Sequence, residues 1–289
     1  MLRNTFVHLP GVGSKRERML WDRGILDWER FLAASGGDFL PRRARESAVP
    51  LICQSLDAVG RGDARFFGPL LPLGETWRLY PEFAGRALFL DIETTGLSGY
   101  WDQVTVIGAL SRDGLALFVQ GMNLNQFPAY IEQFPLLVTF NGSQFDVPFL
   151  RAHFPRARLD QAHIDLRFVL ASLGYRGGLK MVERRLGLSR DPAIQGMDGF
   201  EAVRLWHGYR RGDRAALEKL VLYNLTDVVN LVELAGTAVR IKSRQTAFPG
   251  GLPERPSPVA PRLDQEVVAA QIAACRSQRG KPVGSPRRG

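Results

Sequence analysis

The chain has 289 residues and a hydrophobic content of 45%, which allows one large domain, alone or with a small accessory unit. Its formal net charge of +9 favours a polyanionic partner, although residues 242–289, with 9 basic and 3 acidic side chains, supply most of the excess. Two cysteines exclude a disulfide framework and a cysteine-rich zinc site, and the lack of a signal-peptide pattern or of roughly 18 consecutive apolar residues predicts a cytoplasmic protein with no membrane association.

Residues 1–40 are predicted to form a small helical unit. The turn LPGVG at 9–13 precedes a helix that Ser14 can cap and Gly24 ends, and a second helix follows over about 27–34. The pattern resembles a helix-hairpin-helix unit, whose backbone N–H groups suit a phosphate oxygen. That resemblance predicts nucleic-acid contacts at Gly11, Gly13, Lys15 and Arg16. A helical cap that uses its glycines only for a tight turn is the alternative.

Residues 41–85 are predicted to be a helix followed by an irregular linker. Apolar residues recur about every 3.6 positions over 41–60, and glycine, proline and leucine then cluster in FFGPLLPLGETW. We expect this segment to pack on the main domain and to have no catalytic role.

Residues 86–240 are predicted to form the main domain. Strands are expected at 86–93, 105–110, 115–120 and 136–140, with a short strand and helix within 163–173. Further helices are expected near 128–134, 144–153, 178–187, 199–209 and 213–240. Strands joined by short turns and followed by alternating elements imply an α/β fold, in which helices flank a mixed five-stranded sheet.

Residues 241–289 form a proline-rich basic tail that is expected to be largely disordered. A short amphipathic segment at 264–275 is the one part predicted to be helical. The tail could solubilise the protein or contact phosphates without regard to sequence, and both interpretations stay open.

Two acids, Asp91 and Glu93, end the buried strand in RALFLDIETTGL. Residues two apart on a strand point to the same side, so these carboxylates lie next to each other. Such a pair is costly unless a cation lies between them, and Mg²⁺ prefers oxygen ligands of this kind. A strand end that runs into solvent is the alternative unless partner acids follow.

Partner acids do follow downstream. Asp146 lies in TFNGSQFDVPFL, in the first turns of a helix that comes after a strand, where it could also serve only to complement the helix dipole. Tyr223 and Asp227 are four residues apart, one turn apart on the same face of a long helix. An aspartate among leucine and valine is unusual in a core unless it has a partner.

Together these motifs resemble the three exonuclease motifs of the DnaQ-like 3′–5′ exonucleases, in the DEDDy variant that has a tyrosine four residues before the last aspartate. DIETTGLS, TFNGSQFDVPFL, HIDL, LKMVERRLGL and YNLTDVV resemble the YprB-like ribonuclease-H-like family over about residues 1–240. The resemblance implies a ribonuclease-H-like fold and a metal-dependent exonuclease of DNA or RNA, acting on single strands or 3′ ends.

The resemblance also implies roles for individual residues. Two divalent ions, Mg²⁺ or Mn²⁺, would be held about 4 Å apart by Asp91, Glu93, Asp146 and Asp227, while Tyr223 would position the attacking water. Thr94 and Asn141, within the same motifs, are predicted to contact nucleic acid. A binding protein with an inactive exonuclease fold and a structure-selective endonuclease are the alternatives. The choice between DNA and RNA and any stable protein partner stay open.

Two further residues have competing interpretations. Asp165, in HIDL, could be another acid near the site, and we favour a helix cap. Lys180 follows a Gly-Gly turn and could contact substrate phosphates, and we favour a solvated lysine.

Overall fold

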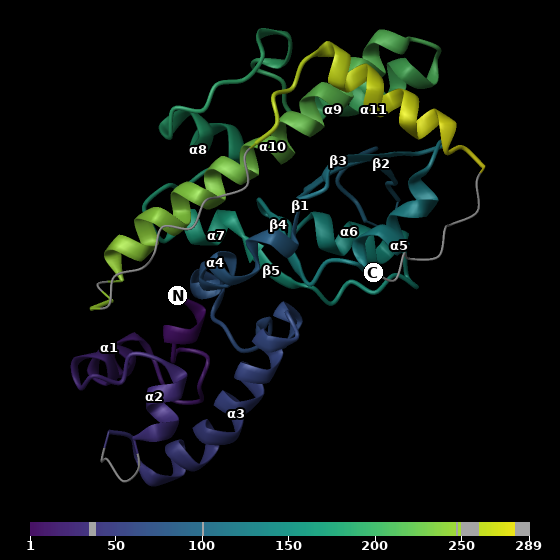
Figure 1. Ribbon diagram of the computed structural model, residues 1–289. Coiled ribbons are helices and arrows are strands. Elements are labelled where there is room, and N and C mark those ends of the chain that lie inside the picture. The colour runs from purple at the N-terminus through teal and green to yellow at the C-terminus, as the bar shows by residue number, and fades with distance from the viewer. Residues whose placement is uncertain (35–38, 100, 247, 250–259, 281–289) are drawn as a thin grey trace.

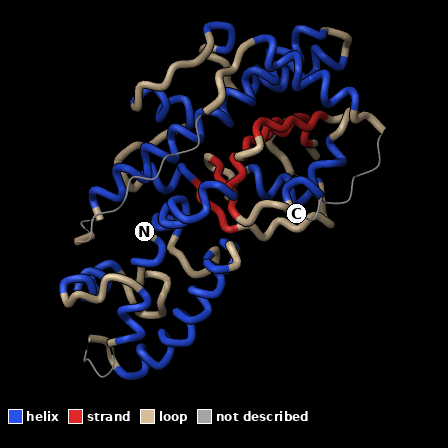
Figure 2. Tube along the Cα trace, in the orientation of Figure 1, coloured by secondary structure: helices blue, strands red, loops and turns tan. Residues whose placement is uncertain are grey.

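The fold is given by a computed structural model that describes residues 1–34, 39–99, 101–246, 248–249 and 260–280. Five strands form one sheet in the order β3-β2-β1-β4-β5, which Figure 2 shows in red. The neighbours β1–β2 and β2–β3 are antiparallel, whereas β1–β4 and β4–β5 are parallel. The predicted mixed five-stranded sheet is therefore confirmed. Its strands are β1 (Ala87–Thr94), β2 (Val104–Ser111), β3 (Gly114–Val119), β4 (Leu136–Thr139) and β5 (Ala162–Asp165).

Helices cover both faces of this sheet (Figure 1). Those of the main domain are α5 (Phe127–Ile131), α6 (Asp146–His153), α7 (Leu166–Ala171), α8 (Leu179–Arg185), α9 (Gly199–Arg210) and α10 (Arg214–Gln245). Short 3-10 turns η5 (Leu124–Gln126) and η6 (Pro192–Ile194) precede α5 and α9. Each helix falls where the sequence predicts one, and α10 continues to Gln245, beyond the predicted end at 240.

Alternation along β1 decides which side chains reach which layer. Leu88, Leu90 and Ile92 pack with residues of α5 and α6 in one hydrophobic cluster. Phe89 packs in another cluster that includes Val228 and other residues of α10. Because residues two apart share a face, the alternation directs Asp91 and Glu93 toward α10.

The N-terminal unit consists of the helices α1 (Ser14–Asp22) and α2 (Trp28–Ala33), preceded by the turn η1 (Leu2–Asn4). Gly24 follows α1 with a φ of 81°, as its predicted role in ending the helix requires. Asp27 caps α2 by accepting from the backbone N–H of Arg30. The predicted cap at Ser14 is wrong: Ser14 is the first helical residue, because the extended residue before it, Gly13, is the N-cap.

The segment from residue 41 to 86 is more regular than expected after its long helix. It contains α3 (Arg42–Gly60), η2 (Ala64–Phe67), η3 (Leu73–Leu79), α4 (Tyr80–Phe83) and η4 (Ala84–Arg86). Glycine and proline prevent a long α-helix here, but single turns still bury apolar side chains such as Phe67, Trp77 and Leu79. The segment packs on β5, α7 and α10, as predicted.

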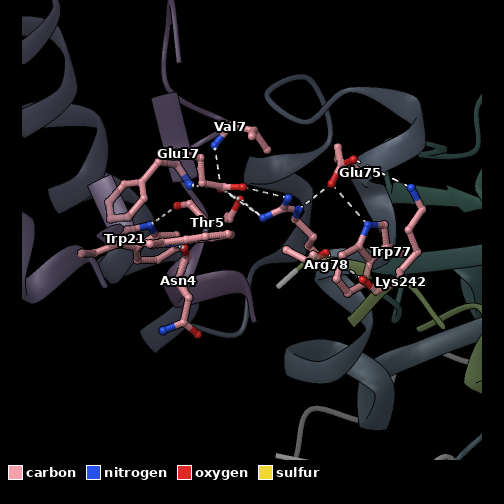
Figure 3. Close-up of polar contacts among 12 residues, drawn as sticks. Asn4, Thr5, Val7, Glu17, Trp21, Glu75, Trp77, Arg78 and Lys242 are labelled. Atoms are coloured by element: carbon pink, nitrogen blue, oxygen red, sulfur yellow. Dashed lines mark hydrogen bonds and ion pairs between the residues drawn. The ribbon is translucent and has the colours of Figure 1, made fainter. Parts of the chain in front are cut away.

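A buried ion pair links the N-terminal unit to the segment that follows it, which in turn contacts α10 of the main domain (Figure 3). Arg78 of η3 donates to both carboxylate oxygens of Glu17 on α1, at 3.0 and 2.9 Å, and both side chains are almost fully buried. Glu17 also accepts from the hydroxyl of Thr5 at 2.8 Å. Glu75, which accepts from Arg78, lies 3.9 Å from Lys242 of α10. A chain of charged pairs therefore runs from α1 to α10, and one continuous hydrophobic cluster extends across the same region.

The C-terminal region adds α11 (Gln265–Ser277), which matches the predicted helical segment. It packs on the edge strand β3, where Cys275 donates to the backbone carbonyl of Leu117. The prolines at 253, 256 and 258 and the last basic residues, 281–289, lie outside the described residues.

Candidate metal centre

Asp91 and Glu93 lie on the central strand, near its C-terminal end. Within β1, Asp91 pairs with Gly108 of β2, and Glu93 pairs with Val106. Glu93 is buried and Asp91 is partly buried. The predicted neighbouring carboxylates are therefore held side by side under α10 rather than released into solvent.

Asp146 reaches the same strand from α6. β1 pairs with β4 only over Ala87–Phe89, so its later N–H groups on that side have no strand partner. The carboxylate of Asp146 occupies this space and accepts from the backbone N–H of Ile92 at 3.2 Å. Because Ile92 lies between Asp91 and Glu93 on β1, this contact brings Asp146 next to the first two acids.

Asp165 holds the turn that leads into α6. Its carboxylate accepts from the backbone N–H groups of Asn141 at 2.8 Å and Ser143 at 3.1 Å. Asn141 has a φ of 68°, a left-handed conformation that asparagine tolerates better than most residues. Asp165 also accepts from the N–H of Arg167, so the predicted cap of α7 is confirmed.

The long helix α10 supplies the last acid and two polar neighbours. Asp227, Tyr223 and Asn224 are all buried on α10, against β1 and β2. Asn224 donates to the Asp91 carboxylate at 2.8 Å and to its backbone carbonyl at 3.1 Å. Gly108 leaves the room for this contact, because a Cβ there would lie 2.1 Å from Asn224 Oδ1. The sequence analysis missed Asn224. The one indication in the sequence is an amide side chain next to Tyr223 in an otherwise apolar part of the helix.

Three of the four acids form a set with the spacing of metal ligands. One carboxylate oxygen from each of Asp91, Glu93 and Asp227 lies within 4.8 Å of the others. Burial, then the charges of the neighbouring acids, raises the pKa of Asp91 and of Glu93 well above the usual range. Burial likewise raises the pKa of Asp146 to about 7 and that of Asp227 to about 6. Clustered carboxylates of this kind fit a hard divalent cation.

Two cationic side chains also reach the acids. Lys180 Nζ donates to the hydroxyl of Tyr223 at 2.5 Å and to the backbone carbonyl of Met197. Burial lowers the pKa of Lys180. The expectation of a solvated lysine is therefore wrong, because α8 turns its first residues toward α10. Arg190, which sequence reasoning missed, lies 2.5 Å from Asp227 through its Nη2 atom.

The charge balance of the cluster supports the metal assignment. Among the described residues, five carboxylates and two cationic side chains meet at or beside the site. The acids are those of Asp91, Glu93, Asp146, Glu183 and Asp227, and the cations are Lys180 and Arg190. When all are ionised, the excess is negative, and a divalent ion would reduce it.

The residues predicted to contact nucleic acid lie partly near the acids and partly in the N-terminal unit. Thr94 is buried beside the acids, and its hydroxyl donates to the carbonyl of Gly96 at 2.5 Å. The side-chain oxygen of Asn141 accepts from Arg167. Gly11, Gly13, Lys15 and Arg16 are all exposed and lie at or just before the start of α1, which Figure 1 shows away from β1. They stay a predicted nucleic-acid contact.

A family model described as the RNase H superfamily matches residues 88–239, more than half of the chain. The chain belongs to the RNase H superfamily. Its five-stranded sheet and flanking helices form the RNase H-like fold. The matched range contains all four acids and Tyr223.

Among solved structures, the chain is similar to the family B DNA polymerase from the hyperthermophilic archaeon Pyrobaculum calidifontis. The two are 18% identical, with a TM-score of 0.44, and the match covers 66% of this chain and 28% of the polymerase. The search of curated proteins finds no match. Within the described ranges, this RNase H superfamily member has no helix with the length and apolar character needed to cross a membrane.

Proposed function

We propose that this RNase H superfamily member is a metal-dependent 3′–5′ exonuclease that hydrolyses phosphodiester bonds of DNA or RNA. The observation that carries the proposal is that one carboxylate oxygen from each of Asp91, Glu93 and Asp227 lies within 4.8 Å of the others. Tyr223 lies one turn before Asp227 on α10, close enough for all three acids to raise the pKa of its phenol. Asp146, from the opposite side of β1, supplies the fourth acid of the motif set.

The carboxylates are proposed to hold one or two divalent ions, Mg²⁺ or Mn²⁺. When bound, such ions would stabilise the charge that develops on the attacking and leaving oxygens of the phosphodiester. Asp91, Glu93 and Asp227 would hold the first ion, and Asp146 would help to hold the second. Asn224 fixes the Asp91 carboxylate through its amide N–H, which keeps the ligand oriented before any cation arrives.

Tyr223 is proposed to position the attacking water. Burial and the neighbouring carboxylates raise the pKa of its phenol, so Tyr223 keeps its proton at neutral pH and acts as a hydrogen-bonding group rather than as a base. Because Lys180 donates to the phenol oxygen, the Tyr223 proton is free to point elsewhere. Water would add to phosphorus as the bond to the 3′ oxygen breaks, which releases a nucleoside 5′-monophosphate.

The test is digestion of 5′-labelled single-stranded DNA and RNA with Mg²⁺ or Mn²⁺. We expect a ladder of successively shorter labelled products with wild type and none with Asp91→Asn. Asp113→Asn, an exposed aspartate in the β2–β3 turn, is the matched control and should cut like wild type. Defined internal fragments would instead indicate an endonuclease, and binding without cleavage would indicate a binding protein.

A further inference from the structure

A buried clamp holds Arg190 in one orientation. Glu183 of α8 accepts from Arg190 Nε at 2.6 Å and from Nη2 at 2.7 Å, so the two planar groups meet in a fork. Asn230 of α10 donates to the same carboxylate at 2.9 Å. Glu183 and Arg190 are both more than nine-tenths buried. Paired contacts of this type fix a guanidinium group more tightly than a single contact does.

The clamped guanidinium touches a proposed metal ligand along one edge. Its Nη2 atom forms an ion pair with Oδ1 of Asp227 at 2.5 Å, without the alignment of a hydrogen bond, and Oδ1 has no hydrogen-bond partner among the described residues. Its Nη1 atom is buried and has no hydrogen-bond partner among the described residues. Arg190 therefore donates to Glu183 through both Nε and Nη2, and it contacts Asp227 through Nη2 only.

An arginine beside a metal-binding aspartate competes with the metal ion for the same carboxylate, because both are positively charged. A free guanidinium could pair with both oxygens of Asp227 and displace a cation from that carboxylate. Glu183 prevents this, because it neutralises Arg190 and holds the group at the side of the site. We propose that the Glu183–Arg190 clamp is a positioning device that fixes Oδ1 of Asp227 and leaves Oδ2 to the metal. The inference rests on the proposed metal-dependent function.

A purely structural tie between α8 and α10 is the competing explanation, since Asn230 and Asp227 both lie on α10. The two explanations differ in what happens to metal affinity. Partners that orient a metal ligand usually change metal affinity about 10–100-fold when they are removed. A tie between helices would change thermal stability and leave the affinity of the folded protein as it was.

The test is the affinity for Mn²⁺ alone, measured by electron paramagnetic resonance of the free ion during titration of the full chain. The double variant Glu183→Gln/Arg190→Gln removes the clamp without changing net charge. We expect its Mn²⁺ affinity to fall about 10–100-fold at a temperature well below its melting transition. The same substitutions in the exposed pair of α3, Arg42→Gln/Glu46→Gln, form the matched control and should leave the affinity unchanged.

Arg190→Lys provides a second variant if the double variant does not fold. It keeps the charge beside Glu183 but cannot form the fork, so we expect at least roughly tenfold weaker Mn²⁺ binding. Wild-type affinity in either folded clamp variant would overturn the positioning role and leave the proposed nuclease intact. Failure of wild type itself to bind Mn²⁺ would instead overturn the proposed function on which the clamp depends.

Discussion

Raising the pH without divalent metal should destabilise the fold through the buried acids of the cluster, and the size of the effect can be worked out for Asp146 and Asp227. The pKa of Asp146 is about 7 and that of Asp227 about 6, against 3.8 for an ordinary aspartate. The folded state therefore holds these protons more tightly than the unfolded chain does. The stabilisation is fully present below the unfolded pKa and is lost as the pH rises through the folded pKa.

The size of this loss follows from the two pKa values. One pKa unit corresponds to about 1.4 kcal/mol, so the two acids together remove on the order of 4 kcal/mol of unfolding free energy between about pH 5 and pH 8. His8 acts in the opposite direction: burial lowers its pKa to about 3, so its contribution is lost as the pH falls. Wild type and the variant used below both contain His8, so the contribution of His8 cancels when their unfolding free energies are compared.

The assay is urea unfolding in a chelator, followed by the fluorescence of the five tryptophans. Wild type is compared with Asp146→Asn/Asp227→Asn, which cannot titrate at either position. The stability of wild type relative to the variant should fall by about 4 kcal/mol from pH 5 to pH 8. Asp57→Asn, an exposed aspartate on α3, should show no such change. A stability difference that stays constant or grows with pH would show that Asp146 and Asp227 do not hold protons more tightly in the folded state.

Three further predictions concern single side chains. Gly108→Ala places a Cβ 2.1 Å from Asn224 Oδ1, so we expect at least roughly tenfold lower nuclease activity, with a stability loss of about 1–3 kcal/mol measured by urea unfolding. Lys180→Met removes the donor to the Tyr223 hydroxyl, and we expect a lower kcat, about 10–100-fold, without a matching fall in melting temperature. Arg78→Met leaves the buried Glu17 carboxylate without its cationic partner, and calorimetry should show a loss of about 3–5 kcal/mol in unfolding free energy.

Each of these variants has a matched control. Gly85→Ala adds a Cβ with no atom within 4 Å and should be neutral. Arg184→Met changes an exposed residue of the same helix as Lys180 and should not alter kcat. Arg42→Met breaks an exposed ion pair and should cost less than about 1 kcal/mol. If a control variant loses as much activity or stability as its test variant, the local explanation for that side chain is wrong.

The sequence predicts the sheet and most of its helices because their signals are local. The run before Asp91 is a buried strand with a clear end, and the apolar spacing around Asp227 is helical throughout. The position of Asp146 also follows from chain order, since it begins the helix after β4. The mixed sheet with flanking helices follows from these local signals, whereas the RNase H-like fold and the grouping of the four acids follow from the resemblance of the motifs to a known family.

The surroundings of the acids could not be predicted in the same way. Lys180 and Arg190 reach the site only because α8 and the segment after it fold back onto α10, and no local pattern reports that contact. Asn224 contacts Asp91 only because Gly108 lacks a side chain. Such contacts depend on tertiary packing between segments far apart in the sequence, which periodicity does not record.

The most direct test of the metal centre is a crystal structure with Mn²⁺, using anomalous scattering at the manganese edge. We expect a peak about 2.0–2.3 Å from carboxylate oxygens of Asp91, Glu93 and Asp227. No peak among these three residues, with the ion absent or bound elsewhere on the chain, would contradict the assignment of this cluster as a metal-dependent nuclease site.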